Sequence, residues 1–224
     1  EVAEAAAEVL EHLGYRVETP RDALCCGRPL YDFGMLGLAK RQLRKILGSL
    51  RKEIQAGTPI VALEPSCAAV FRDELVNLFP QDDGARRLSQ QVFLLSELLA
   101  RHEDLGRLPT LKRRALLHVH CHQKAVMPKD GAQEVLEAMG IDLEVLDAGC
   151  CGMAGSFGFE RGEHYEVSIR CGERALLPAV RQAPGEALIL ADGFSCREQI
   201  AQGTGRQAVH LAQVLRMAVH DGGL

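Results

Sequence analysis

Two copies of Cys-Cys-Gly constrain this chain more than any other feature of its sequence: Cys25-Cys26-Gly27 and Cys150-Cys151-Gly152. Adjacent cysteines cannot easily bond to each other without distorting the peptide between them, so each pair is predicted to bind something else. Gly149 and Gly152 flank the second pair and let the backbone approach that object closely. We therefore expect two related lobes, each built around a Cys-Cys-Gly loop.

The sequence around the two copies repeats as well. In each copy a predicted helix ends at a glycine, and a short strand, the Cys-Cys-Gly loop, a long helix and an apolar strand with a single cysteine at its end follow. Cys26 and Cys67 are 41 residues apart, and Cys151 and Cys196 are 45 apart. Only the second copy has an opening strand, residues 115–119, so we predict that the native chain continues upstream of Glu1 and supplies the missing one.

Hydrophobic periodicity predicts the individual elements. Gly14 is expected to stop the first helix, and the polar segment 81–87 is expected to separate the lobes. The predicted helices are 2–13, 36–54, a segment through 71 and 75, 89–101, a helix from 130 that Gly140 stops, and 163–181. The predicted strands are 15–18, 59–63, 115–119, 143–146 and 187–191.

Strands that alternate with helices indicate parallel sheets. The predicted fold class is α/β, with two pseudo-repeated lobes, each a small parallel sheet flanked by helices, and with cysteines at the C-terminal strand ends, where sites gather in such sheets. Residues 1–80 form the first lobe, which lacks its opening strand. Residues 81–114 form a linker with a helix, and residues 115–224 form the second lobe.

Three strand ends of the second lobe carry four thiols, those of Cys121, Cys150, Cys151 and Cys196. Four thiolates suit a tetrahedral zinc ion or an iron-sulfur cluster. Zinc sites usually use Cys-x-x-Cys, whereas adjacent thiols diverge and suit separate irons, so a cluster is favoured and zinc is its rival. Thiol-disulfide chemistry at the adjacent cysteines is a weaker third interpretation, because the chain has no Cys-x-x-Cys motif.

Other candidate ligands are less complete. Cys25, Cys26 and Cys67 of the first lobe are predicted to bind a cofactor, but a fourth ligand would have to come from the upstream strand or a histidine, so a degenerate or differently filled site is expected. His120 and His122 flank Cys121 and are weaker metal candidates. The eighth cysteine, Cys171, lies in the middle of a predicted helix and is interpreted as a core residue.

Composition excludes several other classes of protein. Eight cysteines could form four disulfides, but a chain of 224 residues that is 47% hydrophobic builds a core without them. The net charge of -4 carries no long run of one sign, so nucleic acid and anionic membranes are poor partners. No apolar run is long enough to cross a bilayer and no basic targeting segment opens the chain, so a cytoplasmic protein is expected.

Five stretches carry a resemblance to a known family: LCCGRPLYDFGML, LEPSCAAVFRDEL, HVHCHQK, GCCGMAGSFGFE and GFSCREQIAQGTGR. They resemble the cysteine-rich CCG domains of heterodisulfide reductase and of the iron-sulfur subunits of glycolate and lactate oxidation. The whole chain is similar to the C-terminal part of fused oxidases that also carry an FAD-linked 2-hydroxyacid dehydrogenase portion and a ferredoxin-like portion. Heterodisulfide reductase repeats have a further cysteine three residues before the last, where this chain has Glu64 and Gly193, so their non-cubane cluster is not implied.

The resemblance implies an electron-transfer module. A 2-hydroxyacid of the glycolate or D-lactate type would be oxidised at FAD in an upstream or partner portion, and electrons would pass through iron-sulfur centres, four-iron clusters above all, toward a quinone or another carrier. The implied partners are a flavin domain or subunit and a ferredoxin-like domain, with a peripheral approach to a quinone acceptor. This chain has no flavin motif and is not expected to be catalytic alone. The alternative is a zinc-binding structural or assembly module without a redox role.

Overall fold

The computed structural model describes residues 1–101, 105–127, 129 and 131–221. It confirms the α/β class, with two small parallel sheets flanked by helices. The chain divides into two compact units, Glu1–Val17 with Leu95–Leu224 (unit 1) and Glu18–Leu94 (unit 2). This grouping by contacts differs from the division by sequence repeat at residues 80 and 115, which stays a prediction.

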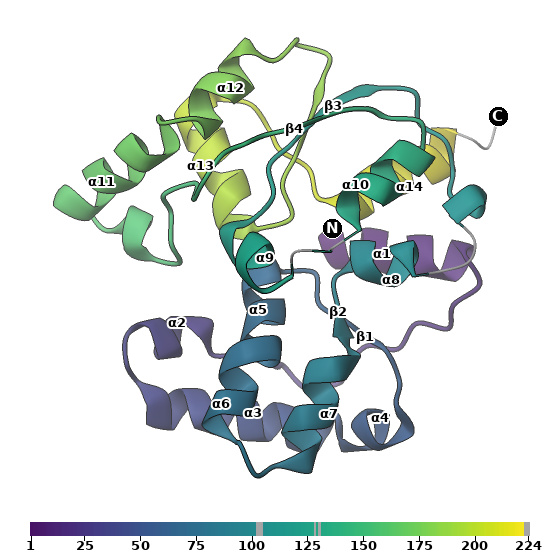
Figure 1. Cartoon of the computed structure of the whole chain (residues 1–224), viewed down its shortest axis with the longest axis vertical. Helices are drawn as coiled ribbons and strands as arrows, with labels where there is room; N and C mark the ends of the chain where they lie inside the picture. The colour runs from purple at the N-terminus through teal and green to yellow at the C-terminus, as the bar shows by residue number, and fades with distance from the viewer. Residues whose placement is uncertain (102–104, 128, 130, 222–224) are drawn as a thin grey trace. The chain divides into compact units, whose positions relative to one another are not determined.

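The sheet of unit 1 has three parallel strands in the order β4-β3-β5 (Figure 1). The central strand, β3, is the first of the three in sequence. Ala115 of β3 lies opposite Leu143 of β4 on one side and Leu188 of β5 on the other. Buried apolar residues in β3 and β5 explain why these segments form strands in a sheet that helices cover. The strands are β3 (Arg114–Leu117), β4 (Asp142–Val145) and β5 (Leu188–Leu190).

The helices of unit 1 pack in two groups, α1 with α14 and α8 with α10 in the first, and α12 with α13 and α11 with α13 in the second. Ala5 and Val9 of α1 are fully buried. The predicted helix 163–181 is interrupted between Gly172 and Leu176. The helices are α1 (Val2–His12), α8 (Leu95–Ala100), η2 (Leu105–Arg107), α9 (Cys121–Val126), α10 (Ala132–Ala138), η3 (Phe157–Phe159), α11 (Glu163–Gly172), α12 (Leu176–Gln182), α13 (Phe194–Thr204) and α14 (Leu211–Asp221).

Unit 2 has a two-stranded parallel sheet in which Ile60 of β1 lies opposite Val92 of β2. The predicted helix 36–54 is present as α3 and α4, and the predicted helix after β1 continues from α5 through a π-helical turn into α6. The elements of this unit are α2 (Arg28–Asp32), α3 (Leu36–Ser49), α4 (Arg51–Ala56), β1 (Ile60–Val61), α5 (Pro65–Ala69), η1 (Val70–Glu74), α6 (Leu75–Leu78), α7 (Asp83–Gln91) and β2 (Val92–Phe93).

Two predicted elements are wrong. Residues 15–18 alternate in exposure as a strand does but belong to no strand of the described part. The polar segment 81–87 contains the start of α7, which the Asp82 carboxylate caps by accepting from Ala85 N at 3.0 Å, and its role as a boundary between lobes stays a prediction. The predicted helix 89–101 is divided by β2, because Val92 and Phe93 pair with β1. Residues 102–104 of the predicted linker lie outside the described part.

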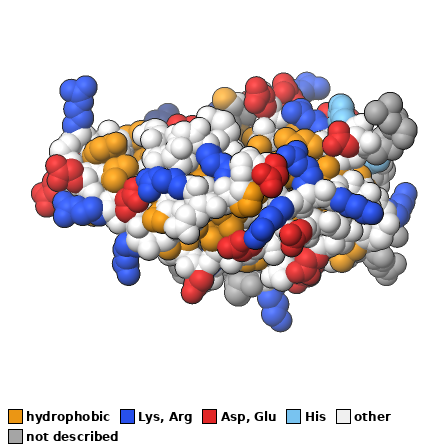
Figure 2. All heavy atoms as spheres, turned by 90° about the horizontal axis from the view of Figure 1, so that it is seen from above, with side chains coloured by type: hydrophobic (Ala, Val, Ile, Leu, Met, Phe, Trp, Pro, Cys, Tyr) orange, Lys and Arg blue, Asp and Glu red, His pale blue; other side chains and the backbone are white. Residues whose placement is uncertain are grey.

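Charged side chains of both signs are interspersed over the face seen in Figure 2, as the balanced composition predicts. Within the described residues, every helix is too short or too polar to cross a lipid bilayer.

Candidate metal centre

The parallel sheet of unit 1 brings four cysteines to one edge. Cys121 is the first residue of α9, which follows β3, and Cys196 lies in the first turn of α13, which follows β5. Cys150 and Cys151 follow β4. Because the three strands are parallel, their C-terminal ends lie at the same edge, and each contributes one or two thiols there.

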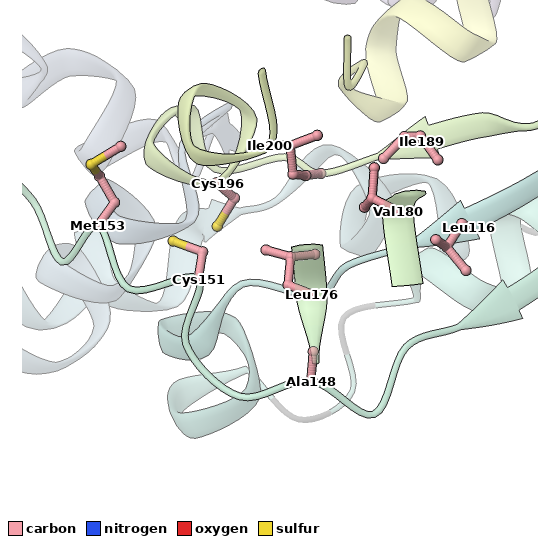
Figure 3. Close-up of a cluster of buried hydrophobic side chains, with 10 residues drawn as sticks. Leu116, Ala148, Cys151, Met153, Leu176, Val180, Ile189, Cys196 and Ile200 are labelled. Atoms are coloured by element: carbon pink, nitrogen blue, oxygen red, sulfur yellow. The ribbon is translucent and has the colours of Figure 1, made fainter. Parts of the chain in front are cut away.

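The four sulfur atoms form a row of hydrogen-bonded contacts. Cys150 contacts both Cys121 and Cys151, and Cys151 in turn contacts Cys196. Figure 3 shows the sulfurs of Cys151 and Cys196 pointing toward each other from the loop and from α13. Both cysteines belong to the buried cluster that also contains Met153 and Ile200. The four thiols that the sequence predicts as ligands are therefore brought together.

Contacts within the row separate the acidities of the four thiols. Hydrogen bonds from Cys121 and Cys151 hold the pKa of Cys150 far below the ordinary thiol value, and the contact with Cys151, aided by His118 and His120, lowers the pKa of Cys196 to about 5. The same contacts, with burial, raise the pKa of Cys121 and of Cys151. Thiolates, which are the metal-binding form, are therefore favoured at Cys150 and Cys196.

Glycines allow the loop to fold tightly around these sulfurs. Gly152 has a φ of +98°, and a Cβ there would overlap the carbonyl oxygen of Ser168. Its N–H donates to Cys150 Sγ at 3.3 Å. A Cβ at Gly193 would lie against the His120 ring and 3.3 Å from Cys196 Sγ. Gly149, in contrast, is exposed and has open space around it, so only its partner Gly152 is required by packing.

The histidines before α9 lie beside the thiol row. His120 is buried, and its Nδ1 accepts from the backbone N–H of His122 at 3.1 Å, which caps α9. With Nδ1 used as an acceptor, the other ring nitrogen faces Gly193. His118 is 1% exposed and lies near Cys196, and neither of its ring nitrogens has a well-aligned partner among the described residues. The rings of His120 and His122 meet edge to face at 5.2 Å.

Two residues whose structural roles the sequence does not indicate hold the second Cys-Cys-Gly loop in place. The Gln199 side chain is buried and donates to the carbonyl oxygens of Cys151 at 3.0 Å and Ser168 at 3.1 Å. Lys124 Nζ donates to the carbonyl oxygen of Ala148 at 2.6 Å. No sequence signal identifies Gln199 as a residue that binds the loop. The two-residue spacing of His118 and His120, in contrast, predicts that both side chains lie on one side of the chain.

Cys171 contacts the second Cys-Cys-Gly loop at both the carbonyl oxygen and the thiol of Cys150. Its thiol donates to the carbonyl oxygen of Cys150 at 3.5 Å from α11, and burial raises its pKa. That Cys171 is not a ligand stays a prediction, and its position makes it a suitable control for the four cysteines of the row.

The first Cys-Cys-Gly loop has a simpler arrangement. Cys26 Sγ and Cys67 Sγ are 2.9 Å apart, whereas the side chain of Cys25 is exposed. The contact with Cys67, together with Arg28, lowers the pKa of Cys26 to about 7, and the same contact with burial raises the pKa of Cys67. Arg28 also forms an ion pair with Glu74 at 2.6 Å, and both side chains are 11% exposed. Unit 2 thus brings together two of its three thiols.

The donor set of unit 1 suits both predicted occupants. Among the described residues, no three Cys, His, Asp or Glu side chains are placed as the ligands of a single ion would be. The four thiols lie at one edge of the sheet, with a glycine N–H aimed at one sulfur. Four thiolates are a common zinc set and also the ligand set of an iron-sulfur cluster, so their chemistry fits either group.

Comparisons with known proteins agree with the repeat. The cysteine-rich domain family CCG matches residues 1–72 and 115–200. One of the subunits of the anaerobic glycerol-3-phosphate dehydrogenase of Escherichia coli strain K12 is 29% identical over 219 residues, which cover 95% of this chain and 54% of that protein. The chain therefore spans about half the length of that relative.

Lactate utilization proteins match over nearly their whole length. The protein A of Bacillus subtilis strain 168 is 28% identical over 230 residues, which cover 96% of this chain and 92% of that protein. The protein A of Geobacillus kaustophilus strain HTA426 is 30% identical over 233 residues, with the same coverage of 96% and 92%.

Proposed function

The chain belongs to the cysteine-rich CCG domain family, and from this premise we propose that it is an iron-sulfur electron-transfer module of an FAD-linked dehydrogenase. Its thiol row, Cys121, Cys150, Cys151 and Cys196, would hold a four-iron cluster. The observation that carries the proposal is the convergence of these four thiols from three parallel strand ends. Such a cluster supplies one-electron transfer between a flavin and a further carrier.

The residues around the row have distinct proposed roles. Cys150 and Cys196 would bind the cluster as thiolates, because their pKa values are lowered. The Gly152 N–H stabilises the charge on Cys150. His120 lies close enough to Cys196 to interact with it electrostatically, and its ring would tune the potential. Gln199 and Lys124 fix the loop backbone at Cys151 and Ala148. None of these side chains binds a hydroxyacid in this proposal.

The substrate and partners come from other parts of the assembly. Relatives named for glycerol-3-phosphate and for lactate support a small hydroxylated, anionic substrate, and we propose a 2-hydroxyacid of the glycolate or D-lactate type. FAD would reside in a flavin domain or partner subunit, a ferredoxin-like domain would relay electrons, and a quinone or another carrier would accept them. This chain alone would not oxidise the substrate.

A zinc-binding structural module is the second candidate, because four cysteine thiolates are also a common zinc set. Metal analysis separates the two. We expect the full-length protein, purified without oxygen, to contain iron and acid-labile sulfide in near-equal amounts in this site. Stoichiometric zinc without sulfide would contradict the electron-transfer proposal and leave the structural one.

Substitution of one ligand tests the site itself. Cys150→Ser is expected to remove most of the iron and sulfide assigned to this site, because it replaces one of the two sulfurs that contact two others. Cys171→Ser is the matched control, since its thiol also contacts Cys150 but Cys171 is predicted to be a core residue and not a ligand. Equal losses in both variants would indicate a disturbed loop rather than a lost ligand.

A further inference from the structure

His118 is a buried polar side chain to which the electron-transfer proposal gives no role. It directly follows β3 and lies three residues before Cys121. Its backbone N–H donates to the carbonyl oxygen of Leu190 in β5 at 2.9 Å, so the pairing of the two strands continues as far as this residue. The side chain is 1% exposed. The ring is therefore held at the C-terminal edge of the sheet and is already enclosed by described residues.

Both ring nitrogens of His118 lack an aligned hydrogen-bond partner among the described residues. A buried polar group without a partner lowers the stability of the folded chain, so such groups are rare and each needs a physical reason. His210 shows the ordinary arrangement. It is also 1% exposed, but its Nδ1 accepts from the backbone N–H of Ala212 at 3.0 Å.

The Cys196 thiol is the neighbour to which the His118 ring can donate. The two side chains are in contact, and Cys196 is itself 1% exposed. They come from paired parallel strands, since His118 follows β3 and Cys196 lies in the first turn of α13 after β5. A backbone N–H, that of Gly152, already points at Cys150 Sγ in the same thiol row. The His118 ring would supply a second N–H, at the other end of the row.

A hydrogen bond at this sulfur would act on the reduction potential. A neutral imidazole has one N–H donor, and a thiolate that binds a metal accepts such a donor. The reduced form of a cluster carries more negative charge on its sulfurs, so the donor stabilises it more than the oxidised form. The Nδ1 of His120 already caps α9, whereas both nitrogens of His118 are available.

We propose that His118 is a positioning residue that donates an N–H hydrogen bond to the Cys196 sulfur and raises the reduction potential of the cluster. This inference rests on the proposed function, because it needs an iron-sulfur cluster in the thiol row. It adds a residue outside the predicted ligand set, and His118 itself binds no metal.

A redox titration of the full-length protein, followed by electron paramagnetic resonance, tests the inference. His118→Phe fills similar space without an N–H and is expected to lower the potential. His118→Gln keeps an N–H donor in its amide and is expected to restore part of the difference.

His210→Phe is the matched control, because it removes an equally buried histidine whose ring bonds to the backbone. We expect it to lower the free energy of unfolding and to leave the potential unchanged. An unchanged potential in His118→Phe, or an equal shift in His210→Phe, would overturn the inference.

A second measurement requires no folded variant of His118. Pulsed electron paramagnetic resonance of the reduced protein, with heavy nitrogen in its histidines, is expected to detect a weakly coupled imidazole nitrogen. The coupling should persist in His120→Asn, whose amide oxygen can still cap α9. Absence of the coupling, its loss in His120→Asn, or a strong coupling typical of a bound ligand would contradict the hydrogen bond from His118.

The outcomes also separate this inference from the proposed function. Stoichiometric zinc without sulfide would overturn both, because the site would then have no cluster potential to raise. An intact cluster whose potential does not respond to His118→Phe would overturn the inference alone and leave the electron-transfer proposal standing.

Discussion

Gly152 carries a conformation that few other residues can adopt. Its φ is +98°, a Cβ there would overlap the Ser168 carbonyl oxygen, and its N–H donates to Cys150. Gly149, three residues earlier, has neither the positive φ nor a close neighbour. The two glycines that flank the cysteine pair therefore have different structural importance, although they look equivalent in the sequence.

Substitution of these glycines tests that difference. Gly152→Ala is expected to lower the free energy of unfolding by about 1–3 kcal/mol, because it adds backbone strain and a steric overlap. It is also expected to reduce the iron content of the protein. Gly149→Ala has open space and is expected to change both quantities little. Unfolding with urea and metal analysis of the two variants provide the comparison, and equal effects would show that the loop relaxes around either side chain.

The four thiols of unit 1 could be predicted from the sequence because cysteine type and strand ends are both visible there. The contributions of Gln199, His118 and Lys124 could not be assigned in the same way. A buried glutamine that binds two carbonyl oxygens looks, in sequence, like any glutamine of a polar helix face. Its role depends on the packing of α13 against the loop and α11, which appears only when the chain is folded.

At the scale of elements, α13 and α11 hold the second Cys-Cys-Gly loop through one side chain. Gln199 of α13 donates to Cys151 O in the loop and to Ser168 O in α11. A further contact reaches the Ser168 hydroxyl at 3.2 Å. The position of Cys151 is therefore coupled to the packing of two helices rather than set by the loop alone.

Gln199→Leu is expected to release this coupling. The carbonyl oxygens of Cys151 and Ser168 lose their buried donor, which costs about 1–3 kcal/mol of stability. A shift in the reduction potential of the bound cluster is also expected, because Cys151 moves relative to its neighbours. Gln133→Leu, on the exposed side of α10, is the control. A lower stability with an unchanged potential would show that Gln199 supports the fold without positioning the cysteine.

Hydrophobic periodicity located most elements but not where they end. The strands β1, β3, β4 and β5 lie where apolar runs predicted them. The errors at 15–18 and 89–101 share one cause, because whether a short apolar segment becomes a strand depends on a partner that periodicity does not reveal. Val92 and Phe93 pair with β1, and residues 15–18 belong to no strand of the described part.

At the scale of the whole chain, the two units carry thiol sites of different size. Unit 1 holds the row of four, and unit 2 holds the Cys26 and Cys67 pair. A group bound only to the folded form of one unit stabilises that unit by mass action. A group bound in the thiol row should therefore stabilise mainly the strands that lead to its ligands.

Hydrogen exchange can measure this difference directly. Removal of the bound metal with a chelator is expected to accelerate amide exchange in β3, β4 and β5, while exchange in β1 and β2 changes little. Mass spectrometry of peptides from the protein with and without its metal gives the exchange rates of both sheets in one experiment. Equal acceleration in both units would indicate that the bound group stabilises the chain as a whole, against its assignment to unit 1.

The order of strands in unit 1 also bears on how the site is made. The central strand β3 is synthesised first, and the edge strand β5, which leads to Cys196, is synthesised last. A nascent chain that ends before β5 offers only three of the four sulfurs. The complete row appears only after the longest-range contact of the sheet has closed, so capture of a metal group by all four sulfurs would follow folding of this unit rather than nucleate it.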